Sequence, residues 1–335
     1  HELNRLLRGA TDTTFMPING RPPEVPEGVR YVITLDADTR LPNGAAYRLI
    51  GAIAHPFNQP RFDPQKGRVV GGYGILQPRI TPSLPTGPRS TTYQRIVSGP
   101  GGVDPYAAAV SDVYQDLFEG GSYTGKGIYD VDIFEAALEG KVPENALLSH
   151  DLYEGVFARA GLLTDVDLFE EFPTNYEVAA RRIHRWARGD WQLLPWILGR
   201  ARGTAGRKEK ARIPAEDRWK MVDNLRRTLV APSSLLVLVA AWILPDVPAL
   251  LWAGLIVGSI AVPAFFPVLD NLRPRRSRIS KRSHLRAVGR DIFVASSQTL
   301  LVVTMLADQA WLMADAVART LWRVFVTRRN LLEWV

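Results

Sequence analysis

YVITLDADT, at residues 31–39, is the stretch that decides the fold. Its apolar part, Val32 to Leu35, is short and runs into turn residues, a pattern that predicts a buried strand. Asp36 and Asp38 follow directly, so both carboxylates are expected at the end of that strand. Two carboxylates at this spacing can reach one divalent ion, and Mg²⁺ or Mn²⁺ prefers such oxygen ligands. The stretch therefore predicts an α/β domain with a candidate metal site.

Two other interpretations of Asp36 and Asp38 have to be weighed. A solvated turn is the simplest, because Asp is common in turns. Phosphatases of the haloacid dehalogenase type also carry Asp-x-Asp after an apolar strand, but they need Thr or Val two residues beyond the second Asp. This chain has Arg40 there, which disfavours a phosphatase. The motif alone leaves the turn and the metal site open.

Strands and helices alternate from residue 1 to about residue 225. Short apolar runs predict strands near 69–70, 73–76 and 163–169, and helical spacing predicts helices over about 46–54, 105–118, 132–138, 151–160 and 175–198. Residues 79–102, rich in Pro, Ser, Thr and Gly, and the glycine-rich residues 120–127 are expected to be loops. The alternation predicts a mostly parallel sheet in a catalytic domain of residues 1–225.

The composition changes in residues 226–335. Two apolar segments, 229–244 and 249–269, are broken by PDVP, and about 20 apolar residues span a bilayer. They predict a transmembrane hairpin over about 229–269, followed by a basic loop at 270–290. A third apolar helix is expected at about 291–318. Because it carries Gln and Asp, it could either span the lipid bilayer or lie in its interface.

Charge distribution and cysteine content narrow the possible functional classes of the protein further. The 335-residue chain has a formal net charge of +7, and much of the excess lies in residues 273–290, beside the apolar segments. Basic residues flanking membrane spans usually face the cytoplasm, so this distribution disfavours nucleic-acid binding. The chain has no Cys, which excludes disulfides and thiolate metal sites. Its two ends are interpreted as cuts inside a longer polypeptide with further domains.

A third candidate carboxylate is Asp151, in the sequence Ser149-His150-Asp151 at the start of a predicted helix. The helix dipole favours an ionised carboxylate there, but Asp is also a common helix cap. His150 is more often structural than a ligand. Gly125, Lys126 and Gly127 form a short glycine-rich loop that is not a Walker loop. These glycines either bring backbone close to a ligand or only turn the chain.

The long helix predicted at 175–198 carries Arg182, Arg185 and Trp186, which share one face. Two arginines and an aromatic ring suit a diphosphate and a sugar, because Arg grips phosphate through several donors. The same face could also be a basic helix packing near a membrane surface, with Trp as an interface residue.

The order of these motifs resembles that of the processive family 2-like glycosyltransferases, such as cellulose, chitin and hyaluronan synthases. Those enzymes carry Asp-x-Asp, then Thr-Glu-Asp or a variant, then Gln-x-x-Arg-Trp before membrane helices. Here the second motif is Ser149-His150-Asp151 and the third has Arg182 in place of Gln. Both departures, together with HELNRLLRG at 1–9, TGKGIYDVD at 124–132 and RNLLEW at 329–334, are similar to the cyclic β-1,2-glucan synthases of bacteria.

This resemblance implies a GT-A-like fold and a UDP-glucose donor, with Mg²⁺ or Mn²⁺ at Asp36 and Asp38 and Asp151 as the general base. It further implies that Arg182 and Arg185 hold the diphosphate, that Trp186 is a sugar platform, and that Gly125, Lys126 and Gly127 lie close to donor or acceptor. The family builds an inverted β-1,2 chain on the protein itself and then closes the ring.

The family also implies a location and a boundary. The catalytic domain is expected on the cytoplasmic side of the bacterial inner membrane. Transferases of this type begin with a strand and an Asp that holds the uracil, so a chain starting at His1 is expected to lack part of its donor pocket. Two alternatives stay open: another processive β-glycan synthase, and a non-catalytic membrane scaffold with a decayed transferase domain.

Overall fold

The computed structural model describes residues 1–15, 23–83, 90–98, 112–143, 145–148, 150–201, 213–272 and 280–333. Its contacts form two compact units, which are described separately. The first comprises residues 1–84, 98–172 and 193–221, and the second comprises 85–97, 173–192 and 222–335. Ser149, residues 105–111 of a predicted helix and residues 273–279 of the basic loop lie outside the described residues.

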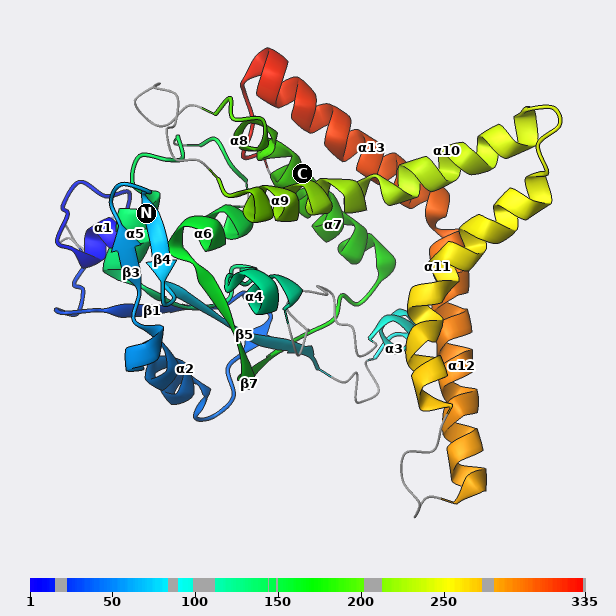
Figure 1. Ribbon diagram of the computed structural model, residues 1–335, viewed down its shortest axis with the longest axis horizontal. Coiled ribbons are helices and arrows are strands. Elements are labelled where there is room, and N and C mark those ends of the chain that lie inside the picture. Colours follow the sequence, from blue (N-terminus) through cyan, green and yellow to red (C-terminus); the bar gives the residue numbers. More distant parts are fainter. Residues whose placement is uncertain are drawn as a thin grey trace. The chain divides into compact units, whose positions relative to one another are not determined.

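The first unit is built on a mixed five-stranded sheet (Figure 1), with strand order β1-β6-β5-β7-β2. The strands are β1 (Tyr31–Thr34), β2 (Thr39–Arg40), β5 (Ile75–Pro82), β6 (Gly127–Asp130) and β7 (Ala160–Glu170). Only β5 and β7 pair in parallel among these described strands, whereas β1–β6, β5–β6 and β2–β7 are antiparallel. The prediction of a mostly parallel sheet is therefore wrong.

The reason is β6, which enters the sheet between β1 and β5 and runs against both. It has four residues and begins with a glycine, so it has too short a pattern to be recognised as a strand. A second correction concerns the predicted loop at 79–102. Strand β5 continues to Pro82, and residues Thr92–Val97 form helix α3.

Proline explains why the end of β5 was missed, since it is disfavoured inside central strands. In the structure, β5 pairs with β6 only through Ile75 and Leu76. The pairing with β7 shifts register between Pro78 and Arg79. Beyond Leu76, β5 therefore no longer pairs with β6, and the shift in its register against β7 accommodates Pro78.

Helices cover the sheet. Helix α2 (Ala45–Ile53) lies on one side and α6 (Asp151–Ala158) on the other (Figure 1). Fully buried Leu49 and Ile53 of α2 pack on Leu76 of β5 and Leu168 of β7. The unit also contains η1 (Pro56–Asn58), β3 (Arg61–Asp63), β4 (Arg68–Gly71), α4 (Val113–Phe118), α5 (Val131–Leu138) and α8 (Leu194–Ile197). The apolar spacing that predicted α2 is thus the spacing that forms this core.

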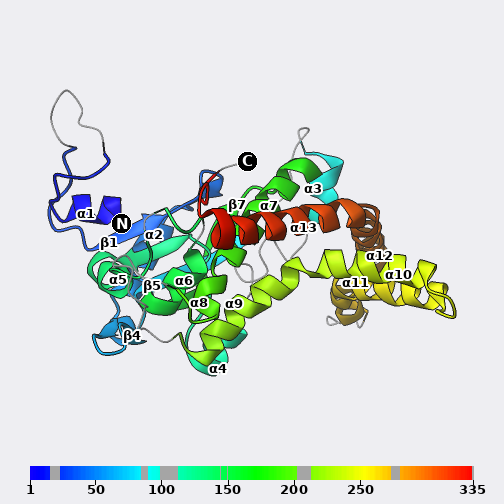
Figure 2. The same ribbon diagram turned by 90° about the horizontal axis from the view of Figure 1, so that it is seen from above.

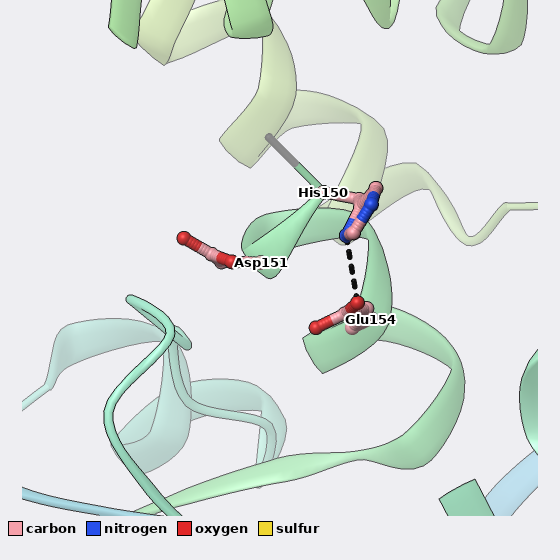
Figure 3. Close-up of side chains that lie close together, drawn as sticks. All are labelled: His150, Asp151 and Glu154. Atoms are coloured by element: carbon pink, nitrogen blue, oxygen red, sulfur yellow. Dashed lines mark ion pairs between the residues drawn. The ribbon is translucent and has the colours of Figure 1, made fainter. Parts of the chain in front are cut away.

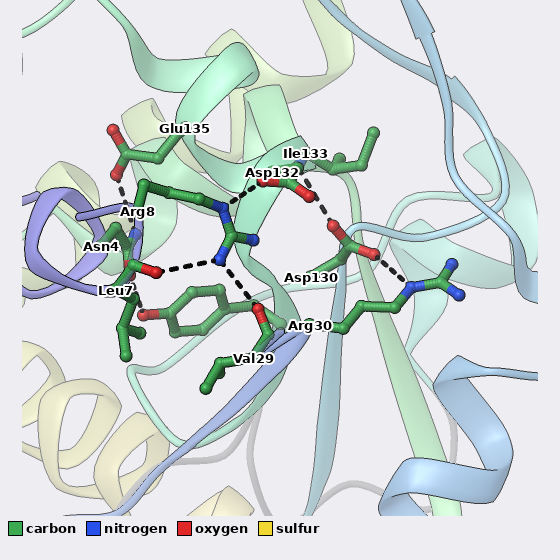
Figure 4. A network of polar contacts seen from close by, with 10 residues as sticks. Asn4, Leu7, Arg8, Val29, Arg30, Asp130, Asp132, Ile133 and Glu135 are labelled. Atoms are coloured by element: carbon green, nitrogen blue, oxygen red, sulfur yellow. Dashed lines mark hydrogen bonds and ion pairs between the residues drawn. The ribbon is translucent and has the colours of Figure 1, made fainter. Parts of the chain in front are cut away.

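A polar network fastens helix α1 (Glu2–Leu7) to α5 (Figure 4). Asn4 donates to Glu135 at 2.8 Å and accepts from the Tyr129 hydroxyl at 2.8 Å. Arg8 contacts Asp132 at 2.6 Å and donates to the backbone oxygen of Val29 at 2.9 Å. The N-terminal segment is thereby held against both strand β6 and helix α5.

The second unit is helical. Figure 2 shows α13 (Leu306–Trp322) alongside α7 (Tyr176–Gln192), and α11 (Ala249–Asn271) packs against α12 (Lys281–Thr304). Helix α10 (Val230–Ile243) contacts both α11 and α13. Helix α9 (Ala215–Thr228) precedes α10, and η2 (Arg323–Thr327) follows α13. The third apolar helix, predicted as one element at about 291–318, is divided between α12 and α13.

One described helix segment, Ala249–Leu269, is long and apolar enough to cross a membrane. Two further spans would be present if each bent pair counts as one: α9 with α10, bent by 44°, and α12 with the helix from Leu306 to Thr327, bent by 56°. The described residues thus contain one helix that could span a bilayer, or up to three.

Candidate active site

Strand pairing places the Asp-x-Asp motif at one edge of the sheet. Strand β1 ends at Thr34, which lies opposite Gly127, the first residue of β6. Asp36, just past the end of β1, therefore lies beside Lys126, just before the start of β6. Asp38 precedes β2, whose Thr39 pairs with Glu170 at the end of β7. Four strands thus bring charged residues to a single edge.

Asp36, Asp38 and Glu170 form the first acidic group of this edge. One carboxylate oxygen from each lies within 4.8 Å of the others. The Asp36 side chain is 48% exposed, whereas that of Glu170 is 8% exposed. Such a set of oxygens fits a hard divalent cation such as Mg²⁺ or Mn²⁺. It is a stronger candidate than the two aspartates alone, because a third carboxylate joins them.

Lys126 lies within this acidic group. Its side chain is 7% exposed, and its Nζ lies 2.9 Å from Asp36 Oδ2 and 3.5 Å from Glu170 Oε2. A buried ammonium needs negative partners, and these two carboxylates provide them. Lys126 was predicted to lie close to a ligand as part of a glycine-rich loop, and its side chain points into the predicted metal site.

The two glycines beside Lys126 have different surroundings. Gly125 has φ +84°, and a Cβ there would lie 3.1 Å from an oxygen of Asp151, so its backbone packs against that carboxyl group. Gly127 has φ +150°, and a Cβ would lie 2.3 Å from the backbone oxygen of Leu76. The glycine at 127 is required by the close approach of β6 to β5, whatever ligand binds nearby.

Asp151 begins helix α6 at the same edge and forms the second acidic group with His150 and Glu154 (Figure 3), since one ligand atom of each of the three lies within 4.8 Å of the others. His150 Nδ1 lies 2.7 Å from Glu154 Oε1. Burial raises the pKa of Asp151 to about 6, with Glu154 and Asp36 adding to the effect and His150 and Lys126 opposing it. Hydrogen bonding to Glu154 raises the pKa of His150.

A carboxyl group with a pKa of about 6 has chemical consequences. It is largely ionised at neutral pH, yet it is a stronger base than an ordinary aspartate, which suits proton abstraction. Asp151, Asp36 and Lys126 influence one another electrostatically, so the predicted base and the predicted metal ligands occupy one site. The alternative of a simple helix cap is wrong, because the N-cap of α6 is His150 and Asp151 is the first residue of the helix.

Arg182, Arg185 and Trp186 lie on α7 and therefore belong to the second unit. The Arg182 guanidinium stacks over the Trp186 ring, 5.0 Å from its centroid. The predicted shared face is thus present on the helix. Their roles towards a diphosphate and a sugar stay predictions.

Two acidic residues were not predicted. Glu170 joins the metal candidates through the pairing of β7 with β2, a long-range contact that no local motif reveals. Glu154 lies one turn after His150 on α6, and this i, i+4 spacing was a readable signal for a pair. A cavity of about 250 Å³ elsewhere in this unit, lined in part by Arg68, Arg159 and Lys220, contains none of the predicted site residues.

Comparison with known proteins finds a relative that matches the whole chain. No protein-family model matches the chain. Over all 335 residues it is 48% identical to the cyclic beta-(1,2)-glucan synthase NdvB of Rhizobium meliloti (strain 1021). The chain spans 11% of the length of that relative. It is therefore homologous to a segment of a glucan synthase, and the resemblance to the cyclic β-1,2-glucan synthases is confirmed.

Proposed function

We propose that this chain carries the transfer site of a membrane-bound, inverting glucosyltransferase that uses UDP-glucose to build and cyclise β-1,2-glucan. The geometric observation that supports this most is the meeting of Asp36, Asp38, Lys126 and Asp151 at one sheet edge. The similarity to a cyclic β-1,2-glucan synthase supplies the product class. A GT-A-like sheet, with ligand groups at strand ends, is part of the proposal.

The residues have distinct roles. Asp36 and Asp38, with Glu170, would hold Mg²⁺ or Mn²⁺, which when bound neutralises charge on the departing UDP. Asp151 accepts the proton from the acceptor 2-hydroxyl as that oxygen attacks the anomeric carbon. Attack from the face opposite UDP converts the α-linked donor glucose into a β-linked unit. The proton lost by the hydroxyl is then held on Asp151.

The resemblance assigns the remaining roles to residues of helix α7. Arg182 and Arg185 bind the diphosphate, because guanidinium groups match phosphate oxygens in charge and geometry. Trp186 offers an aromatic surface for a sugar ring. The acceptor is a growing glucan attached to the protein itself, and the natural polypeptide contributes further domains.

Product analysis tests this proposal. The full-length protein in membranes, incubated with labelled UDP-glucose and Mn²⁺, should release UDP and form a β-1,2-linked cyclic glucan. A product with another β linkage would support a different processive synthase. Absence of any UDP release would favour a non-catalytic scaffold and contradict the proposal.

The proposal also places the transfer site on the cytoplasmic side of the inner membrane. It rests on the apolar helix Ala249–Leu269 and on basic residues nearby. Asp246, in the turn between α10 and α11, and Ser283, at the start of α12, are both exposed and form a matched pair. In intact cells, a membrane-impermeant thiol reagent should label Asp246→Cys but not Ser283→Cys. The reverse pattern would contradict the orientation.

A further inference from the structure

Lys126 occupies an unusual position for a lysine. Its side chain is 7% exposed and lies between Asp36, at 2.9 Å, and Glu170, at 3.5 Å. Asp36 is one of the proposed metal ligands, and Glu170 is nearly as buried as Lys126. A lysine ammonium thus contacts carboxylates that the proposed function assigns to a divalent cation.

Charge counting makes this arrangement informative. Asp36, Asp38 and Glu170 carry three negative charges when ionised, and Lys126 returns one positive charge. The four groups together retain two negative charges, which is the charge that one divalent cation neutralises. The three carboxylates therefore carry enough negative charge to neutralise both Lys126 and one divalent cation.

Lys126 and a divalent cation nevertheless compete for the same position beside Asp36. A metal bound to the Asp36 oxygen at about 2.1 Å would lie about 3 to 5 Å from an ammonium that keeps its own contact with that oxygen. Two cations at this separation repel each other, strongly so beside a protein interior. Glu170 offers Lys126 a second partner that is already within reach. The lysine can therefore release Asp36 without losing a carboxylate.

We propose that Lys126 is a built-in cation of the donor site, which holds Asp36 until a divalent cation binds and, once the metal takes Asp36, keeps its contact with one oxygen of Glu170 and leaves the other oxygen to that cation. This inference rests on the proposed function, because it requires the metal site. It assigns Lys126 a positioning role: the residue keeps the carboxylates together before donor binding and competes with the metal for one of them.

A second buried lysine in the same unit shows that burial alone does not create this arrangement. Lys141 is 8% exposed, and its ammonium lies 5.0 Å from the centroid of the Phe157 ring. It belongs to neither acidic group of the site. Lys141→Met therefore removes a buried lysine charge without altering the proposed competition, and is a matched control.

Manganese binding to the full-length protein, without nucleotide, tests the inference. We expect Lys126→Met to bind Mn²⁺ about tenfold more tightly than wild type, the equivalent of about 1.4 kcal/mol, because a competing cation has been removed. Lys126→Arg, which keeps the charge, and Lys141→Met should both bind like wild type. Electron paramagnetic resonance of free Mn²⁺ gives the affinities directly.

The controls separate the two proposals. Unchanged or weaker Mn²⁺ binding by Lys126→Met, in protein whose melting temperature stays within a few degrees of wild type, would overturn the role of Lys126. If that variant unfolds, Lys126→Gln is measured in its place and judged by the same criterion. If Asp38→Ala binds Mn²⁺ as wild type does, the metal assignment fails, and the Lys126 inference fails with it. Failure of the proposed reaction is seen independently, as absence of UDP release by the wild-type protein.

Discussion

The sheet edge of the first unit and the α7–α13 pair of the second unit both gather charged side chains, but they balance them differently. Asp315 of α13 lies 2.9 Å from His184 of α7 and 2.9 Å from Arg319 on its own helix, so one carboxylate meets two basic groups. At the sheet edge, Asp36 and Glu170 contact one ammonium, and Asp38 belongs to the same acidic group. Excess negative charge at a partly exposed edge indicates a positively charged ligand, whereas the Asp315–His184 contact joins two packed helices.

The largest effect is expected at the sheet edge. Asp38→Ala should reduce release of UDP from UDP-glucose roughly a thousandfold, since a bound metal contributes several kcal/mol to the transition state. The fold should persist, because Asp38 lies at a strand end outside the apolar core. The measurement is UDP release at saturating Mn²⁺, with circular dichroism to verify folding. Normal release would remove Asp38 from the metal site.

A smaller loss is expected on α7, where the proposal assigns diphosphate binding to Arg182 and Arg185 but not to Arg181. Arg185→Ala should lower kcat/KM for UDP-glucose about tenfold to a hundredfold, the range for a lost hydrogen bond to a charged group. The control is Arg181→Ala, which removes an exposed ion pair with Glu177 and should change the rate less than twofold. Equal effects of the two substitutions would contradict the assignment.

Activity should also depend on pH through Asp151. Its pKa is raised to about 6, so the proton-accepting form is lost as the pH falls below that value. The rate at pH 7 should be about ten times that at pH 5. Since the ordinary pKa is about 3.9, ionisation of Asp151 also costs folding stability as the pH rises from about 4 to about 6. UDP binding measured over the same pH range separates donor binding from proton transfer to Asp151. A rate that does not change between pH 5 and pH 7 would contradict the base role.

The smallest effect is expected in the α7–α13 pair. Asp315→Asn weakens contacts to His184 and Arg319 at a partly exposed position, so we expect a loss of about 1 kcal/mol in stability. Glucan synthesis per folded molecule should stay within twofold of wild type. The melting temperature in detergent and the activity in membranes measure the two quantities. A large loss of activity without loss of stability would show that the comparison between the two regions is wrong.

Local patterns predicted the parts of the fold that depend on neighbouring residues. The apolar run before Asp36 forms β1, and the helical spacing after residue 45 forms α2. Strand β6 and the end of β5 were missed because short or proline-containing strands are defined by their partners in the sheet. Glu170 joined the site for the same reason. Its position depends on the pairing of β7 with β2, which no spacing along the chain encodes.

The candidate site was predicted as a set of motifs, and only some of its geometry follows from them. Asp36 and Asp38 are separated by one residue, so their proximity was expected. The approach of Asp151 to Gly125 depends on where α6 begins relative to β6, a tertiary relation. The burial that raises the pKa of Asp151 likewise comes from surrounding elements. The identities of the site residues could therefore be predicted from the sequence, whereas the raised pKa of Asp151 required the structure.

The central claim is that Asp151 is the base of glucosyl transfer, and Asp151→Asn in the full-length protein tests it most directly. Asn keeps the shape of the side chain, and the N-cap of α6 is His150 and not Asp151, so the fold and the binding of UDP and Mn²⁺ should persist. Asp165→Asn, at an exposed carboxylate that contacts Arg48 at 3.2 Å, is the matched control and should stay near wild-type activity. With labelled UDP-glucose in membranes, we expect glucan synthesis by Asp151→Asn to fall at least about a hundredfold. Synthesis at a near-normal rate would contradict the account.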